Sequence, residues 1–378
     1  MDKNRKNLKN TSKKTINFIT YDLGINGGTK AIIEFAYNFV DLGYNVNIIY
    51  PAHIFPKIFN YEFDKEYFLK IGSKILRIFK QLIGKNPNDD SKIKKWFKIR
   101  ANVLKVPHLS NKYIPDADFV FATWWETASH VKKLNASKGK KCYLIQHYEV
   151  WGGRKNRVDE TYKYGFFNVV NSNWLKEIIL KETGVKTNAT ILHSPDDETF
   201  NYKLTKRKDK DIRVMIVYRN IVWKGMKEGI AAFEKAKKQV PNLKLVLAGQ
   251  LDNQIPKYAE AHKGPVSQEK LNELYNSADI FLFPSLIEGF GMPPMEAMRC
   301  KVAVVSTDVG ALRDYSIDGV SVMLSKPGDI NAMANNIVKL AKNEKLRKQI
   351  AENGYKNIQK YTWRETTKQL NEYLEKLK

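Results

Sequence analysis

Two glutamates stand on either side of a turn in the segment SLIEGFGMPPMEAM, residues 285–298. Seven residues separate Glu288 from Glu296, and the first four are Gly289, Phe290, Gly291 and Met292. A helix is expected to start near Pro293, where free backbone N–H groups favour a negatively charged ligand. The carboxylates could be the acid and base of a glycosidase, but beside amides and cations they are better placed to accept hydrogen bonds from sugar hydroxyls. The simpler alternative is a strand, a turn and a helix without a ligand.

Two cations follow an apolar run in the segment VYRNIVWKG, residues 217–225. Arg219 and Lys224 flank a short loop at which a second helix is expected to begin. An arginine can bind two phosphate oxygens at once and a lysine adds a compact positive charge, so this pair could neutralise a diphosphate. Exposed cations are also common in a basic protein that binds nothing at that place.

Glycines and a histidine mark two further strand ends. Gly27 and Gly28 lie where a strand leads into a helix, and they would let the backbone approach a ligand at the helix N-terminus. The three spaced glycines of a dinucleotide fingerprint are missing, which disfavours a nicotinamide enzyme. His147 ends the run YLIQH and could bind a ligand or carry a proton near neutral pH. A plain turn and a structural histidine are the alternatives.

Clustered carboxylates occur at PNDDS (87–91) and PDDE (195–198). Both lie in sequence that is typical of solvated turns, so we interpret them as turns and not as metal sites. We therefore expect no metal site and no cofactor.

Short apolar runs alternate with helical spacing along the whole chain. Strands are predicted at 15–20, 45–50, 118–123, 142–147 and 167–172, and then at 213–218, 244–249, 280–285 and 302–307. Helices are predicted at 29–42, 225–239, 268–276, 329–342 and 344–360. Apolar strands separated by helices indicate parallel sheets covered on both faces. The sequence predicts an α/β protein with two doubly wound, Rossmann-like domains facing a central cleft, with ligands at the carboxyl ends of the strands.

A polar, charged run at 193–211 separates the two series of strands. We predict an N-terminal domain at 1–195, a C-terminal domain at 196–360 and a final helix at 361–378. No convincing strand is found between 53 and 112, so this part is predicted to be an insertion in the first domain.

Within this insertion, residues 68–83 have the spacing of an amphipathic helix with Lys70, Lys74, Arg77 and Lys80 nearby. We predict that the segment 66–100 binds an anionic membrane surface. The alternative is that the apolar face packs on the first domain.

Lysine and arginine outnumber aspartate and glutamate by 64 to 40, which gives a formal charge of +24. This surplus indicates a polyanionic partner, and we favour phosphorylated ligands and an anionic membrane over nucleic acid. Two cysteines, Cys142 and Cys300, fit a reducing compartment. Neither a signal peptide nor an apolar run of membrane-spanning length is recognised, so a cytoplasmic location is expected, with peripheral attachment to the inner face of the membrane.

Taken together, these motifs resemble those of the retaining GT-B-fold glycosyltransferases of family four (glycosyl transferases group 1), of the bacterial cell-surface polysaccharide type. PSLIEGFGMPPMEAM is similar to the Glu-x7-Glu motif of that family. Supporting similarities are NGGTKAIIEFAYNFVDLGYNV, YRNIVWKG, GPVSQEKLNELYNSADIFLFPS and YSIDGVSVML, and YTWRETTKQLNEYLEKL resembles the last helix, which in the family crosses back to the first domain.

The resemblance implies an enzyme that moves a sugar from a nucleotide-diphosphate sugar to a glycan or lipid-linked acceptor without a metal. It implies that Glu288 and His147 lie at the transferred sugar and that Glu296 binds the ribose. Arg219 and Lys224 would bind the diphosphate, and Gly27, Gly28 and the backbone at 289–292 would contact the donor.

This sequence departs from the family pattern in three places. Tyr218 and the segment HSPDDETF stand where glycines are usual, and Cys300–Lys301 stands where a small residue and a glycine are common. These differences leave the identity of the donor's nucleotide base and of its sugar unassigned. A sugar-nucleotide epimerase of the same fold and a non-catalytic protein that binds polyanions or membranes remain as alternatives.

Overall fold

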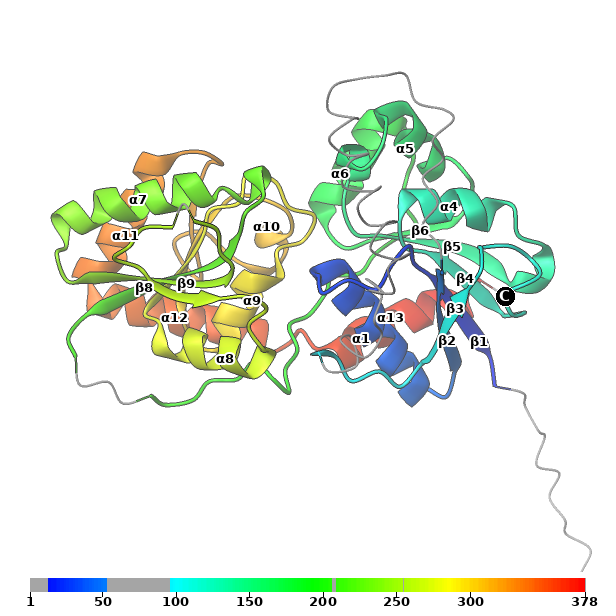
Figure 1. Ribbon diagram of the computed structural model, residues 1–378, viewed down its shortest axis with the longest axis horizontal. Coiled ribbons are helices and arrows are strands. Elements are labelled where there is room, and N and C mark those ends of the chain that lie inside the picture. The colour runs from blue at the N-terminus through cyan, green and yellow to red at the C-terminus, as the bar shows by residue number, and fades with distance from the viewer. Residues whose placement is uncertain (1–12, 53–95, 206–208, 254, 378) are drawn as a thin grey trace, which may run out of the picture. The chain divides into compact units, whose positions relative to one another are not determined.

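A computed structural model describes residues 13–52, 96–205, 209–253 and 255–377 (Figure 1). The chain divides into two compact units, Met1–Leu144 and Ile145–Lys378. The predicted amphipathic segment at 68–83 and its basic residues lie outside the described residues, as does PNDDS.

The first unit is built on parallel strands in the order β3-β2-β1-β4-β5. Their bounds are β1 Thr15–Ile19, β2 Asn45–Pro51, β3 Asn102–Val106, β4 Phe119–Ala122 and β5 Lys140–Ile145. The helices are α1 Gly27–Asp41 and α4 Trp125–Lys132, with a 3-10 turn at Ala136–Lys138. Phe18 of β1 is fully buried and contacts both Phe39 of α1 and Phe121 of β4. The apolar runs therefore form buried parallel strands, as the sequence predicts.

β3 corrects one expectation, because it lies within 53–112, where no strand was predicted. Its sequence NVLKV is polar at Asn102 and Lys105, and four of its five residues are at least partly exposed. β3 lies at the edge of the sheet and pairs only with β2 among the described strands. An edge strand needs no continuous apolar run, so its sequence gives a weak signal.

In the second unit, β6 Phe167–Val170 pairs in parallel with β7 Ala189–Thr190. The helices here are α5 Lys155–Tyr162 and α6 Asn173–Thr183, after a 3-10 turn (η3) at Glu149–Trp151.

A six-stranded parallel sheet follows in the order β10-β9-β8-β11-β12-β13. Its strands are β8 Ile212–Arg219, β9 Leu243–Gln250, β10 Glu260–Lys263, β11 Ile280–Phe283, β12 Ala303–Thr307 and β13 Met323–Ser325. The helices are α7 Met226–Gln239, α8 Gln268–Ser277, α9 Met292–Arg299, α10 Leu312–Tyr315, α11 Ile330–Lys342 and α12 Glu344–Ile358, with a 3-10 turn (η4) at Val222–Lys224.

Both faces of this sheet are buried, and alternate residues of each strand face opposite ways. Val214, Leu245 and Leu282 belong to one core together with α7 and α11. Met215, Val246 and Phe281 belong to the other, together with α8 and α9. Helices on both faces of a parallel sheet are the doubly wound arrangement that the sequence predicts.

The last helix, α13 Trp363–Glu375, packs on the first part of the second unit. Thr366 donates a hydrogen bond from Oγ1 to the carbonyl of Leu192 at 3.1 Å. The ring of Tyr373 lies 6.1 Å from that of Phe167, and the ring of Trp363 lies 5.4 Å from that of His193. These contacts tie the end of the chain to β6 and to the segment after β7.

Candidate active site

The predicted site is organised around an ion pair between Lys224 and Glu288. Lys224 ends the 3-10 turn that follows β8, and Glu288 lies in the loop between β11 and α9. Lys224 Nζ lies 2.6 Å from Glu288 Oε1, and Ser285 Oγ donates to the same oxygen at 2.7 Å. The Glu288 side chain is 9% exposed and that of Lys224 23% exposed. A charge-assisted bond that is mostly removed from solvent fixes the carboxylate firmly.

Close backbone contacts hold the two loops together. Gly225 has a φ of 63°, and a Cβ on it would lie 2.0 Å from the carbonyl oxygen of Pro284. The amide of Leu286 donates to the carbonyl of Trp223 at 2.8 Å. Only a glycine fits at position 225, because its conformation is left-handed and there is no room for a side chain. The YRNIVWKG motif is therefore shaped to approach the loop that carries Glu288.

Gly289 brings the same loop against the segment that follows β5. A Cβ on Gly289 would lie 2.1 Å from the carbonyl oxygen of Gln146 and 3.2 Å from Cα of His147. Ser172 Oγ also donates to the Gly289 carbonyl at 3.0 Å. The structure therefore brings His147 together with Glu288 and Lys224.

The chemistry of His147 follows from its surroundings. Its Nδ1 lies 3.0 Å from the carbonyl oxygen of Tyr148. A carbonyl can only accept, so Nδ1 carries the proton and Nε2 is the acceptor of the neutral ring. Burial lowers the pKa of His147, while the Tyr148 carbonyl and the Glu288 carboxylate oppose this shift. A neutral imidazole at this place can accept a hydrogen bond from a ligand hydroxyl.

Four consecutive amides precede and begin helix α9. In the described ranges, the N–H groups of residues 289–292 donate to no protein oxygen. Pro293 and Pro294 follow directly and lack an N–H, so three of the four amides belong to the loop and only that of Met292 belongs to the helix. Gly291, with a φ of 92°, caps the helix. Successive free amides of this kind form a concave binding place for anions.

Arg219 is the last residue of β8 and is half-buried. Within the described part of the chain, no carboxylate forms an ion pair with its guanidinium. Arg219 and Lys224 therefore both lie at the carboxyl end of β8, and among the described residues only Lys224 of the two pairs with a carboxylate, that of Glu288. This leaves positive charge to meet a ligand.

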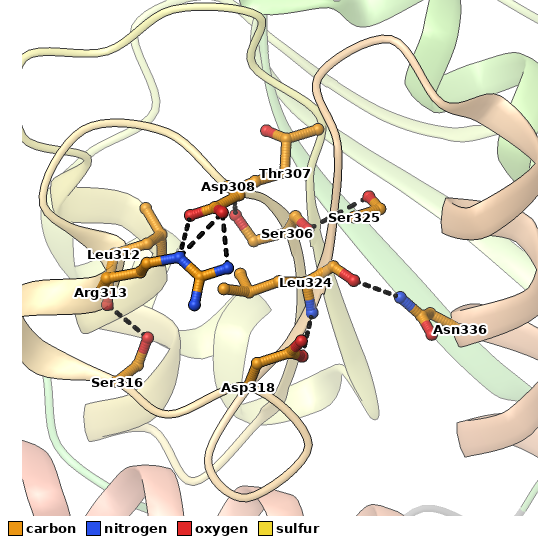
Figure 2. Close-up of polar contacts among 10 residues, drawn as sticks. All are labelled: Ser306, Thr307, Asp308, Leu312, Arg313, Ser316, Asp318, Leu324, Ser325 and Asn336. Atoms are coloured by element: carbon orange, nitrogen blue, oxygen red, sulfur yellow. Dashed lines mark hydrogen bonds and ion pairs between the residues drawn. The ribbon is translucent and has the colours of Figure 1, made fainter.

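The segment after β12 forms hydrogen bonds to the loop of residues 288–292, which we call the glycine loop. Tyr315 donates to the carbonyl of Gly291 at 2.9 Å, and the amide of Ala311 donates to the carbonyl of Phe290 at 3.0 Å. Figure 2 shows Asp308 in a forked ion pair with Arg313, at 2.7 Å between its closest atoms. The ring of Phe290 is buried in the core, so Phe290 offers a ligand only its backbone.

Glu296 lies in α9 and is 7% exposed. Its Oε2 accepts a hydrogen bond from Tyr275 Oη at 3.2 Å. Burial raises the pKa of the neighbouring Cys300 thiol, with the Glu296 carboxylate adding to the shift. The contact between Glu296 and a ribose stays a prediction.

Gly27 and Gly28 begin α1 in the first unit, where the side chain of Asn26 caps the helix by accepting from the amide of Thr29 at 2.9 Å. Their contact with a donor also stays a prediction.

Three functional neighbours were missed by sequence reasoning: Ser285, Trp151 and Trp223. Ser285 lies three residues before Glu288, a spacing at which a hydroxyl can reach a carboxylate in a turn. The ring of Trp151 lies 6.1 Å from that of His147 and 5.7 Å from that of Trp223, which directly precedes Lys224. Their proximity in sequence to predicted residues was the available signal.

Among the described helices, none combines the length and the apolar character that crossing a membrane requires.

The two parallel, doubly wound sheets have the architecture of the GT-B fold. Residues 197–357 match the family described as Glycosyl transferases group 1. This part of the chain therefore matches the group 1 glycosyltransferase family, and the Glu-x7-Glu motif lies within the matched residues.

Similar proteins include CapM of Staphylococcus aureus, a capsular polysaccharide biosynthesis glycosyltransferase that is 26% identical over 57% of this chain and 61% of its own length. HepE of Anabaena, solved with UDP-glucose, is 15% identical with a TM-score of 0.68 over 96% of this chain and 100% of its own. A mutant of S. aureus TarM, solved with fondaparinux, alpha-GlcNAc-glycerol and UDP, is 14% identical with a TM-score of 0.68 over 96% of this chain and 99% of its own. At these identities the solved structures are alike in fold. The chain spans between 29 and 61% of the length of three curated relatives that it matches.

Proposed function

We propose that the protein is a retaining glycosyltransferase that moves a sugar from a nucleotide-diphosphate sugar to a glycan or lipid-linked acceptor in cell-surface polysaccharide synthesis. The observation that carries the proposal is the Lys224–Glu288 pair, held at 2.6 Å between the segment that follows Arg219 and the loop that carries the free amides. This site offers donors for a diphosphate next to acceptors for sugar hydroxyls. The named activities of CapM and the UDP ligands of HepE and TarM support the same substrate class.

The leaving diphosphate gains negative charge as the glycosidic bond breaks. Arg219, Lys224 and the amides of residues 289–292 would stabilise that charge from fixed positions. Because these groups belong to the protein, we propose that the reaction needs no added divalent metal.

The arrangement around Glu288 favours a role in holding the sugar. Its Oε1 already accepts from Lys224 and Ser285, so Oε2 is left to accept from a sugar hydroxyl. In our proposal, the departing phosphate takes the proton of the acceptor hydroxyl on the face that it leaves, and the anomeric configuration is retained. His147, neutral and accepting at Nε2, would bind a second sugar hydroxyl.

The test starts with a thermal-shift screen of nucleotide sugars, since a ligand that binds the folded state raises the melting temperature. The selected donor is then incubated with and without membrane-derived acceptor glycans in the presence of EDTA. Transfer with unchanged anomeric configuration, read by NMR of the product, is the expected result. Inversion, a requirement for metal, or epimerisation of the donor in the absence of acceptor would contradict the proposal.

We also propose that the enzyme works on the cytoplasmic side of a membrane and uses the segment 66–100 as an electrostatic anchor. Lys70, Lys74, Arg77 and Lys80 supply the charge, at about 1 kcal/mol per cation near an anionic surface. Co-sedimentation with anionic vesicles should fade as salt rises and should be lost when the four are changed to glutamine. Binding to neutral vesicles, or binding that survives these changes, would rule the anchor out.

A further inference from the structure

A pair of tryptophans, one exposed and one partly buried, adjoins the candidate active site. Trp151 ends the 3-10 turn η3 and Trp223 lies in η4, and their ring centroids are 5.7 Å apart at an interplanar angle of 33°. We call Trp151 and Trp223 the tryptophan pair. About half of Trp151 is solvent-accessible, at 49%. Large aromatic side chains are normally covered, so a half-exposed tryptophan beside a polar site marks a binding surface.

Each ring of the tryptophan pair is held next to a group of the candidate active site. Trp151 meets the ring of His147 edge to face, with centroids 6.1 Å apart. Trp223 precedes Lys224, and its carbonyl accepts from the amide of Leu286 in the loop that carries Glu288. Rings that are held by neighbouring backbone and side chains can position a ligand with little loss of entropy.

We propose that the tryptophan pair is an acceptor subsite that stacks on the pyranose ring of the glycan that receives the sugar. This inference rests on the proposed function and names the ligand class of its acceptor side. One face of a pyranose carries C–H bonds, which suit an aromatic ring, and its rim carries hydroxyls. The rim would face the transferred sugar that His147 Nε2 and Glu288 hold.

A lipid tail fits the same surface less well. An apolar chain needs a continuous apolar lining, whereas the inner border of the tryptophan pair is formed by an imidazole and an ion pair. The exposed apolar residues Val222 and Ile287 lie next to Trp223 and Glu288 in sequence. Aromatic rings beside polar groups are typical of a carbohydrate site.

The kinetic test compares Trp151→Ala and Trp223→Ala with the wild type. Each change should raise KM for the acceptor glycan roughly three- to tenfold and leave KM for the donor unchanged. Trp151→Phe should restore much of the loss, because it retains a ring. The matched control is Tyr373→Ala on α13, which removes another exposed aromatic ring, 39% accessible, and should leave both constants unchanged. An unchanged acceptor KM in both tryptophan variants, with donor turnover intact, would overturn the subsite and leave the proposed function standing.

A binding test works without any transferase activity. The seven tryptophans are replaced by fluorotryptophan, and the 19F resonances of the tryptophan pair are assigned with the phenylalanine variants. Methyl pyranosides of glucose, galactose, mannose and N-acetylglucosamine are then added at millimolar concentration. At least one should shift both resonances while those of the buried Trp125 and Trp363 stay in place. Three results would overturn the proposal. The first is that glycerol shifts the resonances as much as every pyranoside does, and the second is that no pyranoside shifts them. The third is that they shift only with vesicles that contain polyprenyl phosphate.

Discussion

The two cations of the site have different partners, and so their removal should have different consequences. Arg219→Ala should lower kcat/KM, by an amount that corresponds to a loss of about 2–4 kcal/mol of transition-state stabilisation. The Tm of this variant should change little. Lys224→Ala should cost a similar amount and should also lower Tm, because it leaves the buried Glu288 carboxylate without its cation. Steady-state kinetics and thermal unfolding measure both effects.

Lys227→Ala is the matched control for this pair of variants, since Lys227 is an exposed cation on α7 three residues beyond Lys224. It should change neither quantity. Near-normal turnover in both Arg219→Ala and Lys224→Ala would contradict the role of the two cations at the diphosphate.

The two glutamates are expected to have separate roles. Glu288→Gln should lower turnover while the free nucleoside diphosphate still binds, because Glu288 holds the sugar. Glu296→Gln should weaken binding of the nucleoside diphosphate itself. Calorimetry with the nucleotide chosen by the thermal-shift screen measures both. Tyr275→Phe, which removes only the hydrogen bond to Glu296 Oε2, is the control for disturbance of the buried helix. Equal losses of nucleotide affinity in the two glutamine variants would reject this division.

Residue types and spacing could predict which side chains gather at the site, but not which atoms they offer. Lys224 and Glu288 come together because β8 and β11 are neighbours in one parallel sheet, so their carboxyl ends lie at the same edge. His147 follows β5 of the other sheet, and the close approach of Gly289 brings the Glu288 loop to it. The buried ring of Phe290 and the two prolines after Met292 show that the ligand-facing groups of this loop are backbone amides. Amides are common to all residues except proline, so no residue type signals them.

Among the elements, the glycine loop depends on one close approach that a single methyl group would block. Gly289→Ala places Cβ 2.1 Å from the Gln146 carbonyl oxygen. The loop must then move away from His147, which should cost about 1–3 kcal/mol of stability and most of the activity. Chemical denaturation and turnover are the measurements.

Gly184→Ala is the control for this substitution. Gly184 caps α6 with a φ of 73°, and nothing lies within 4 Å of the position of an added Cβ. It should lose about 1–2 kcal/mol from backbone strain and keep normal turnover. Full activity in Gly289→Ala would show that the contact with Gln146 is not needed.

The strands that sequence reasoning missed are short or lie at sheet edges. β10, with the sequence EAHK, is exposed along most of its length, and β13 has only three residues. Such strands gain their stability from one neighbour and need no apolar run. Lys301 is one of the departures from the family pattern, because it stands where the family commonly has glycine. Its φ of 59° is the left-handed conformation that glycine favours. Its ion pair with Glu352 at 2.6 Å accompanies this strained backbone.

At the scale of the whole molecule, His193 links the glycine loop to the last helix. It is 2% exposed, and its ring lies 5.0 Å from that of Phe290 and 5.4 Å from that of Trp363. Burial lowers the pKa of His193 from 6.5 to about 3. The folded protein therefore keeps this ring neutral at acidities where the unfolded chain binds a proton.

The buried, neutral ring of His193 should therefore lower the free energy of unfolding in acid, over a defined range of pH. Below pH 6.5 the unfolded state binds one more proton than the folded state, so the free energy of unfolding should fall until about pH 3 and then level off. Between pH 7.5 and 5.0 this one group should cost about 2 kcal/mol. Urea unfolding at these two pH values measures the loss, and His193→Phe, which keeps a ring but cannot titrate, should reduce it by that amount. His108→Gln, at an exposed histidine, should not. If His193→Phe loses as much stability in acid as the wild type, the buried ring does not control the acid sensitivity of the protein.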